Sequence, residues 1–204
     1  MRLLREDLDG LWWETLQRVI DVAAHEVKDA LNGVSVNLEV IRSRSGRRPS
    51  NPTSVVDFAE AASGQFEALS ERVEAVLFLS RPHKPAGAPV DVSLTLRHLG
   101  SLLAPAAKAN GGSLGVEGSD KAATTSAPAA ATRLALATPL LSLIKEGGRG
   151  RCQLEPGQET VVRFSHESAG TCSLDPAVAE ALAEYDIQNK RSGSDLLLIF
   201  PGLG

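Results

Sequence analysis

A long series of apolar residues at helical spacing dominates the first part of the chain. From Leu16 to Ile41 these residues recur at steps of three and four, which keeps them within about 40° of one line on a helix. The pattern predicts a helix from about Leu11 to Arg44, far longer than an average globular helix. A helix of this length needs a partner along its stripe. The stripe consists of Leu16, Ile20, Ala23, Val27, Ala30, Val34, Leu38 and Ile41.

A second long helix is predicted after a short break. Glycine and two prolines between Ser45 and Pro52 end the first helix. Thr53 or Ser54 can cap the next one, with Asp57 in the capping-box position after Ser54. The second helix is expected to end near Ser80. Its apolar stripe consists of Ala59, Ala62, Phe66, Leu69, Val73 and Val76.

Two helices joined in this way form a hairpin, which buries only a strip of each helix surface. A four-helix bundle built by two chains would cover the rest, so we expect a homodimer. The alternative is a monomer in which the hairpin packs against the remainder of the same chain.

A proline-rich linker separates the hairpin from a region of different character. Three prolines fall within the nine residues from Arg81 to Pro89. We therefore expect a helical hairpin domain over residues 1–82 and a small α/β sandwich over residues 90–204, which makes the fold class α+β. Strands are expected at Val90–Val92, Ser113–Glu117, Arg151–Leu154, Thr160–Ser165 and Asp195–Phe200. Helices are expected after Ser93 and after Asp175, each of which can serve as the N-cap, and from Thr132 to Glu146, with a loop over Ala122–Ala131.

Charge and cysteine content exclude several classes of protein. A net charge of −4 argues against a nucleic-acid binder, and the cluster Arg42, Arg44, Arg47 and Arg48 is interpreted as a solvated turn. The two cysteines, Cys152 and Cys172, cannot by themselves form a disulfide framework or a four-ligand zinc site. A site shared with His166 matches no familiar spacing, so no metal is expected.

The sequence also predicts no membrane segment. Acidic residues stand near the start where a signal peptide needs an apolar core, and no apolar run approaches about 18 residues. A cytoplasmic protein without a bound cofactor is expected.

His25 is the residue most suited to chemistry. It lies about 180° from the centre of the first apolar stripe, so it points into solvent from the middle of a long helix. A neutral imidazole nitrogen is nucleophilic near neutral pH, and a nearby carboxylate such as that of Glu26 can orient it or accept its proton. Position alone favours an ordinary surface histidine on a polar face over a reactive one. Its polar neighbours on this face are Arg18, Asp21, Lys28, Asp29 and Asn32.

The residues around His25 resemble a known motif. Ala24–Asn32 is similar to the H-box of sensor histidine kinases, roughly His-Glu/Asp-x-Lys/Arg-Asn/Thr-Pro-Leu-Asn. His25, Glu26, Lys28, Leu31 and Asn32 match, whereas Asp29 replaces Asn or Thr and Ala30 replaces Pro. The resemblance implies a hairpin that dimerises into a four-helix bundle and phosphorylation of His25 at Nε2. It assigns catalysis to His25 and Glu26, and phosphoryl or partner binding to Lys28, Asp29 and Asn32.

The region after the linker resembles an ATP-binding domain of these kinases that has lost its nucleotide-binding motifs. Ser142 and Glu146 stand where the kinases carry two asparagines, one of which helps to hold Mg²⁺. Ser165–Gly170 does not match the Asp-x-Gly-x-Gly box, and Arg191–Ser194 does not match the Gly-x-Gly loop. Glycine-rich turns expose the backbone amides that cradle phosphates, and these turns are missing.

A good H-box beside an eroded ATP site resembles the dimeric histidine phosphotransferases of bacterial phosphorelays. The resemblance implies that His25 passes a phosphoryl group between the aspartates of receiver domains of response regulators, with Mg²⁺ supplied by the receiver and phosphate entering from an upstream hybrid or sensor histidine kinase. Two alternatives stay open. One is an ATP-dependent histidine kinase in which Glu146 holds Mg²⁺. The other is a pseudokinase scaffold that binds response regulators without catalysis.

Overall fold

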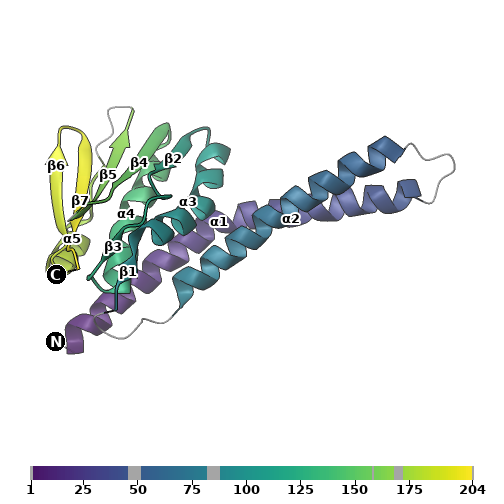
Figure 1. Cartoon of the computed structure of the whole chain (residues 1–204). Helices are drawn as coiled ribbons and strands as arrows, with labels where there is room; N and C mark the ends of the chain where they lie inside the picture. Colours follow the sequence, from purple (N-terminus) through teal and green to yellow (C-terminus); the bar gives the residue numbers. More distant parts are fainter. Residues whose placement is uncertain (1, 46–51, 82–87, 158, 168–171, 204) are drawn as a thin grey trace.

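Two long helices form a hairpin that extends far beyond the rest of the molecule (Figure 1). The computed structural model describes residues 2–45, 52–81, 88–157, 159–167 and 172–203. The hairpin consists of α1 (Arg2–Ser45) and α2 (Pro52–Ser80). The predictions for Arg47, Arg48 and the linker histidine His83 lie outside the described residues.

Both hairpin helices begin earlier than the sequence predicted. Helix α1 begins at Arg2 rather than near Leu11, because Leu8 and Trp12 continue its apolar stripe and are 3% and 4% exposed. Helix α2 begins at Pro52, so Thr53 and Ser54 both lie inside the helix and the predicted cap is wrong. Proline favours the first helical turn, since its φ is already helical and the N–H it lacks has no partner there. The predicted end at Ser80 is confirmed.

A five-stranded mixed sheet and three helices make up the remainder of the chain. The sheet order is β2-β4-β5-β7-β6, in which only the β2–β4 pair is parallel among the described strands. Strands β1 and β3 form a separate antiparallel pair. The elements in chain order are β1 (Val90–Asp91), α3 (Val92–Ala109), β2 (Ser113–Glu117), β3 (Thr124–Thr125), α4 (Ala129–Glu146), β4 (Arg149–Glu155), β5 (Thr160–His166), α5 (Pro176–Ala183), β6 (Gln188–Ser192) and β7 (Asp195–Phe200).

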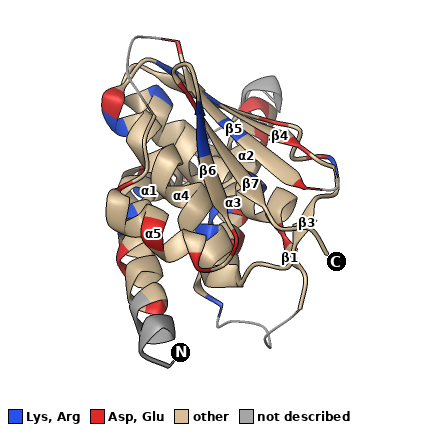
Figure 2. Ribbon diagram, turned by 90° about the vertical axis from the view of Figure 1, so that its left-hand side faces the viewer, with Lys and Arg blue, Asp and Glu red and all other residues tan. Residues whose placement is uncertain are grey.

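Several local predictions for this region are corrected. Asp91 rather than Ser93 caps α3, since its side chain accepts a hydrogen bond from the amide of Leu94 at 2.8 Å. The expected loop over Ala122–Ala131 contains β3 and the first turn of α4. Strand β6 was not predicted, because all five of its side chains are exposed. Figure 2 shows basic residues along this edge strand, where charge discourages pairing with another chain.

Helices α3 and α4 cover one face of the sheet and separate it from α1 (Figure 1). The strands confirm this arrangement, because β4 and β5 alternate buried and more exposed side chains. The α+β class is confirmed, with an N-terminal helical hairpin and a small sheet domain.

The base of the hairpin shares one hydrophobic core with the sheet domain. Leu16 and Val19 of α1 and Leu79 of α2 are at most 1% exposed and belong to the same buried cluster as the residues of α3, α4 and the sheet. The outer part of the hairpin differs. Among the described residues from 24 to 74, Ala62 is the only one that is buried. The hairpin is therefore anchored at its base and lacks a core along most of its length.

Candidate functional site

His25 lies on α1 where the hairpin leaves the shared core. Ala23, two residues earlier, is 2% exposed and belongs to that core. The side chain of His25 is 74% exposed, which confirms its predicted outward direction. A helix fixed by packing on one face therefore presents an imidazole to solvent on another.

The carboxylate in contact with the imidazole is that of Asp29. Its Oδ2 lies 3.2 Å from Nε2 of His25, and the two residues are one helical turn apart. Glu26, for which the sequence suggested an orienting role, is half-buried at the flank of the helix. Lys28 and Asn32 are exposed on the same helix as His25. A carboxylate at this distance attracts the ring when Nε2 carries a proton, and both side chains stay exposed to solvent.

An open cleft of about 840 Å³ borders the site, between the hairpin and the first helix of the sheet domain. Glu26 and Asp29 of α1 line it, together with Arg72 of α2 and Lys108 of α3. A second hollow of about 450 Å³ shares Glu26, Asp29 and Arg72 and continues along the hairpin. Small residues form much of the surface between these charges, so a partner can approach the backbone closely. They are Ala30, Ala61, Gly64, Ala68, Gly100, Ser101, Ala104 and Ala109.

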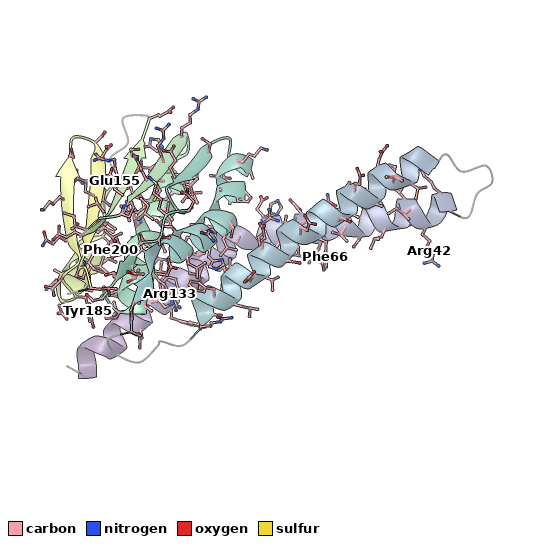
Figure 3. All side chains as sticks on the ribbon, viewed as in Figure 1. Arg42, Phe66, Arg133, Glu155, Tyr185 and Phe200 are labelled. Atoms are coloured by element: carbon pink, nitrogen blue, oxygen red, sulfur yellow. The ribbon has the colours of Figure 1, made fainter. Side chains whose placement is uncertain are left out.

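Arg133 fixes the sheet domain to the end of the hairpin (Figure 3). Its guanidinium donates hydrogen bonds to the carbonyl oxygens of Phe78, Leu79 and Arg81 at 3.2, 3.1 and 2.9 Å. It also lies 5.6 Å from the ring centre of Phe78 and 6.0 Å from that of Trp12. Sequence reasoning missed this residue. The signal was present, because Arg133 is the only charged residue between Ala129 and Ile144.

The residues at the positions that resemble a kinase nucleotide site line a different cavity from the cleft beside Asp29. Ser142 and Glu146 border a space of about 860 Å³ that Thr15 and Arg18 of α1 close from the other side. No group of three His, Cys, Asp or Glu residues in the described part of the chain is placed to hold a metal ion.

The cysteines and the remaining described histidines are engaged in packing. Burial raises the pKa of Cys172 to about 12 and raises that of Cys152 above its usual range, so both thiols stay protonated at neutral pH. Nε2 of His166 contacts the carbonyl oxygen of Gly147. His98 stacks on Phe78 at 4.5 Å between ring centres, and burial lowers its pKa.

The outer hairpin carries an uncovered apolar surface. Leu38 and Phe66 are 54% and 60% exposed, and both line a groove of about 440 Å³ between the two helices. Phe66 projects from the middle of the hairpin, with Arg42 near its far end (Figure 3). We call this surface the hairpin groove. It is lined by Val34, Leu38, Ile41, Ala59, Ala62, Ser63, Phe66 and Glu67.

Comparisons with known proteins identify no family. No family model matches the sequence, and no curated protein matches it. Among solved structures, full-length ShkA in complex with AMPPNP is similar at 15% identity and a TM-score of 0.39, over 90% of this chain and 45% of that one. The chain thus spans less than half of ShkA. The Acinetobacter baumannii histidine kinase AdeS is similar at 15% identity and a TM-score of 0.36, over 88% of this chain and 98% of that one.

No helix in the described part of the chain is both long and apolar enough to cross a bilayer.

Proposed function

We propose that the protein is a histidine phosphotransferase of a two-component phosphorelay, which carries a phosphoryl group between receiver-domain aspartates through Nε2 of His25 and does not use ATP. One observation carries the proposal. An imidazole that is 74% exposed stands on a core-anchored helix beside an open cleft. The H-box resemblance of Ala24–Asn32 names the same nitrogen as the phosphoacceptor.

The transfer requires little chemistry from this chain. The lone pair of Nε2 forms the bond to phosphorus, while the bond from phosphorus to the receiver's aspartate oxygen breaks and leaves its electron pair on that carboxylate. Nδ1 then loses a proton to water or to Glu26. Mg²⁺ in the receiver's acidic pocket would neutralise charge, and Lys28 and Asn32 would contact the phosphoryl group or the receiver. Positioning supplies most of the rate in such an in-line transfer.

Two features support a role without ATP. The turn between β6 and β7 is a tight hairpin, because Ser192 pairs with Asp195 and only Gly193 and Ser194 lie between them. This turn stands where the kinases that the sequence resembles carry a glycine-rich phosphate-binding loop. A turn of two residues does not provide the backbone amides of such a loop. The shared core and the hydrogen bonds of Arg133 also hold the sheet domain against the hairpin. A kinase domain would have to move relative to the hairpin to bring a bound nucleotide to His25, and these contacts oppose such a movement.

The direct test is to follow labelled phosphate. The protein is incubated with a panel of receiver domains carrying ³²P on the aspartate, and separately with [γ-³²P]ATP and Mg²⁺. We expect label to reach the protein from at least one receiver as an acid-labile, alkali-stable phosphohistidine, and none from ATP. Label from ATP would indicate the kinase alternative. Absence of label from both donors, with receivers still bound, would indicate the scaffold.

We also propose that two copies of the chain pair along the hairpin groove to form a four-helix bundle. The outer hairpin buries only Ala62 among its described residues, although large apolar side chains follow the same face of both helices. Such a continuous stripe on two antiparallel helices fits a second identical hairpin. The exposed apolar residues on this face are Leu31, Leu38, Phe66, Val73 and Leu77.

Phe66→Glu is expected to convert the dimer to a monomer. The substitution places a charge in the bundle seam twice, once from each chain, and should weaken the dimer by at least about 100-fold. Light scattering after size exclusion would show the mass fall from twice 21.5 kDa to 21.5 kDa. Val36→Glu is the matched control, because Val36 is 59% exposed but does not line the groove. Equal masses for Phe66→Glu and the wild-type protein would contradict the dimer.

A further inference from the structure

Asp29 contacts the nitrogen that the proposed reaction phosphorylates. A ring nitrogen has a single in-plane direction in which it binds either a proton or phosphorus. The Oδ2 of Asp29 lies 3.2 Å from Nε2 of His25, and this contact is attractive when Nε2 carries a proton. The contact and the N–P bond therefore exclude each other.

The contact can open without disturbing the fold. The side chain of Asp29 is 56% exposed and that of His25 is 74% exposed, so either can rotate into solvent. Such an exposed pair contributes little to stability. The acceptor state of His25 requires an Nε2 without a proton, since its lone pair must be free to bind phosphorus, and the neutral ring then carries its proton on Nδ1.

Charge adds a second effect after transfer. A phosphoryl group carries up to two negative charges near neutral pH, and the Asp29 carboxylate stays one helical turn away with the same sign of charge. Glu26 and Glu71 add negative charge to the neighbouring cleft, where Arg72 and Lys108 are positive. Of the acidic groups, Asp29 is the one in contact with the nitrogen that would be phosphorylated.

We infer that Asp29 competes with the phosphoryl group for Nε2 of His25 and so shifts the phosphotransfer equilibrium toward the receiver aspartate. This inference rests on the proposed phosphotransferase function and states toward which partner the transfer equilibrium lies. At equilibrium the phosphoryl group then lies further toward the receiver aspartate than it would without this carboxylate. Asp29 acts here as a positioning residue through its contact with His25.

The equilibrium between labelled receiver and labelled protein tests the inference. Asp29→Asn removes the charge at constant size and should raise the ratio of phosphohistidine to phosphoaspartate by about 3- to 10-fold, as expected for one exposed charge acting on a doubly charged group. The gain should shrink as salt is raised, because the charges are screened. A purely structural role for Asp29 would not produce this salt dependence.

Asp21→Asn is the matched control, since Asp21 is an exposed aspartate one turn before His25 and its removal changes the net charge equally. An equal effect of both variants, or none from Asp29→Asn, would overturn the inference while leaving the phosphotransferase proposal intact. Failure of the wild-type protein to accept label would instead contradict the proposed function.

A spectroscopic measurement is independent of any receiver. Long-range ¹H–¹⁵N correlation spectra report which imidazole nitrogen carries the proton. In the wild-type protein the neutral ring of His25 should be mainly protonated at Nε2, and Asp29→Ala should shift the ring toward a mixture of both tautomers. An unchanged tautomer ratio in Asp29→Ala would show that the carboxylate does not hold the Nε2 proton.

Discussion

Replacement of His25 by alanine is expected to reduce label transfer from a phosphorylated receiver by at least about 1,000-fold, because it removes the nucleophile itself. The fold should remain intact. The side chain is 74% exposed, and alanine is the best helix former, so the melting temperature should change by only a few degrees. Transfer is measured with the ³²P-labelled receiver that labels the wild-type protein, and folding by circular dichroism.

The other described histidines provide the control. His98 stacks on Phe78, and Nε2 of His166 contacts the carbonyl oxygen of Gly147, so neither ring is free to attack a phosphoryl group. His98→Gln should therefore retain transfer. Transfer that persists in His25→Ala would show that another residue accepts the phosphoryl group, and would remove the basis of the proposed mechanism.

The hairpin and the position of His25 were predictable because both follow from helical periodicity. The spacing from Leu16 onward predicted α1 through Arg44, and the same geometry placed His25 on the solvent side. The contact with Asp29 was not predicted, because the orienting role was given to the neighbouring Glu26, although the i, i+4 spacing places Asp29 one helical turn from His25. The presence of each helix and the outward direction of His25 follow from the periodicity of a single helix, so the sequence suffices to predict them.

Features that depend on tertiary contacts could not be predicted from the periodicity of single helices and strands. The cleft beside Glu26 needs Lys108 of α3, which is distant in sequence. Strand β6 carries no alternation, because an exposed edge strand buries no side chain. Ser93 was expected to be a helix cap, yet its hydroxyl accepts from the amide of Ala123 and donates to the carbonyl of Lys121. Such long-range partners redirect a residue whose local pattern favours a helix start.

Arg133→Ala is expected to lower the free energy of unfolding by about 3 kcal/mol, since hydrogen bonds to a charged group contribute about 1.5–3 kcal/mol and the buried carbonyl of Leu79 loses its guanidinium donor. Phe78 and Leu79 in the last turn of α2 and Arg81 just after it supply the carbonyls that accept these hydrogen bonds, and the last carbonyls of a helix lack the internal donors that earlier ones have. Burial lowers the pKa of Arg133 and the charge of Arg81 adds to this, but a guanidinium stays charged at neutral pH.

Thermal and urea unfolding measure this effect. A loss of about 3 kcal/mol corresponds to a fall in melting temperature of roughly 6–12 °C for a chain of this size. Arg149→Ala is the matched control, because the side chain of Arg149 is 75% exposed and pairs with Glu167 at 3.5 Å. Such a surface pair contributes about 0–1 kcal/mol. Equal melting temperatures for Arg133→Ala and Arg149→Ala would contradict the role assigned to Arg133.

Hydrogen exchange distinguishes a local effect of Arg133→Ala at the end of α2 from a loss of stability throughout the protein. If Arg133 fixes the sheet domain to the hairpin, backbone amides at the end of α2 should exchange faster in Arg133→Ala under native conditions, while those of β5 and β7 keep their protection. Arg133→Lys should fall between the variants, because one ammonium group cannot reach three carbonyls as the planar guanidinium does. Uniform loss of protection would assign Arg133 to general stability and remove its role in holding the two parts together.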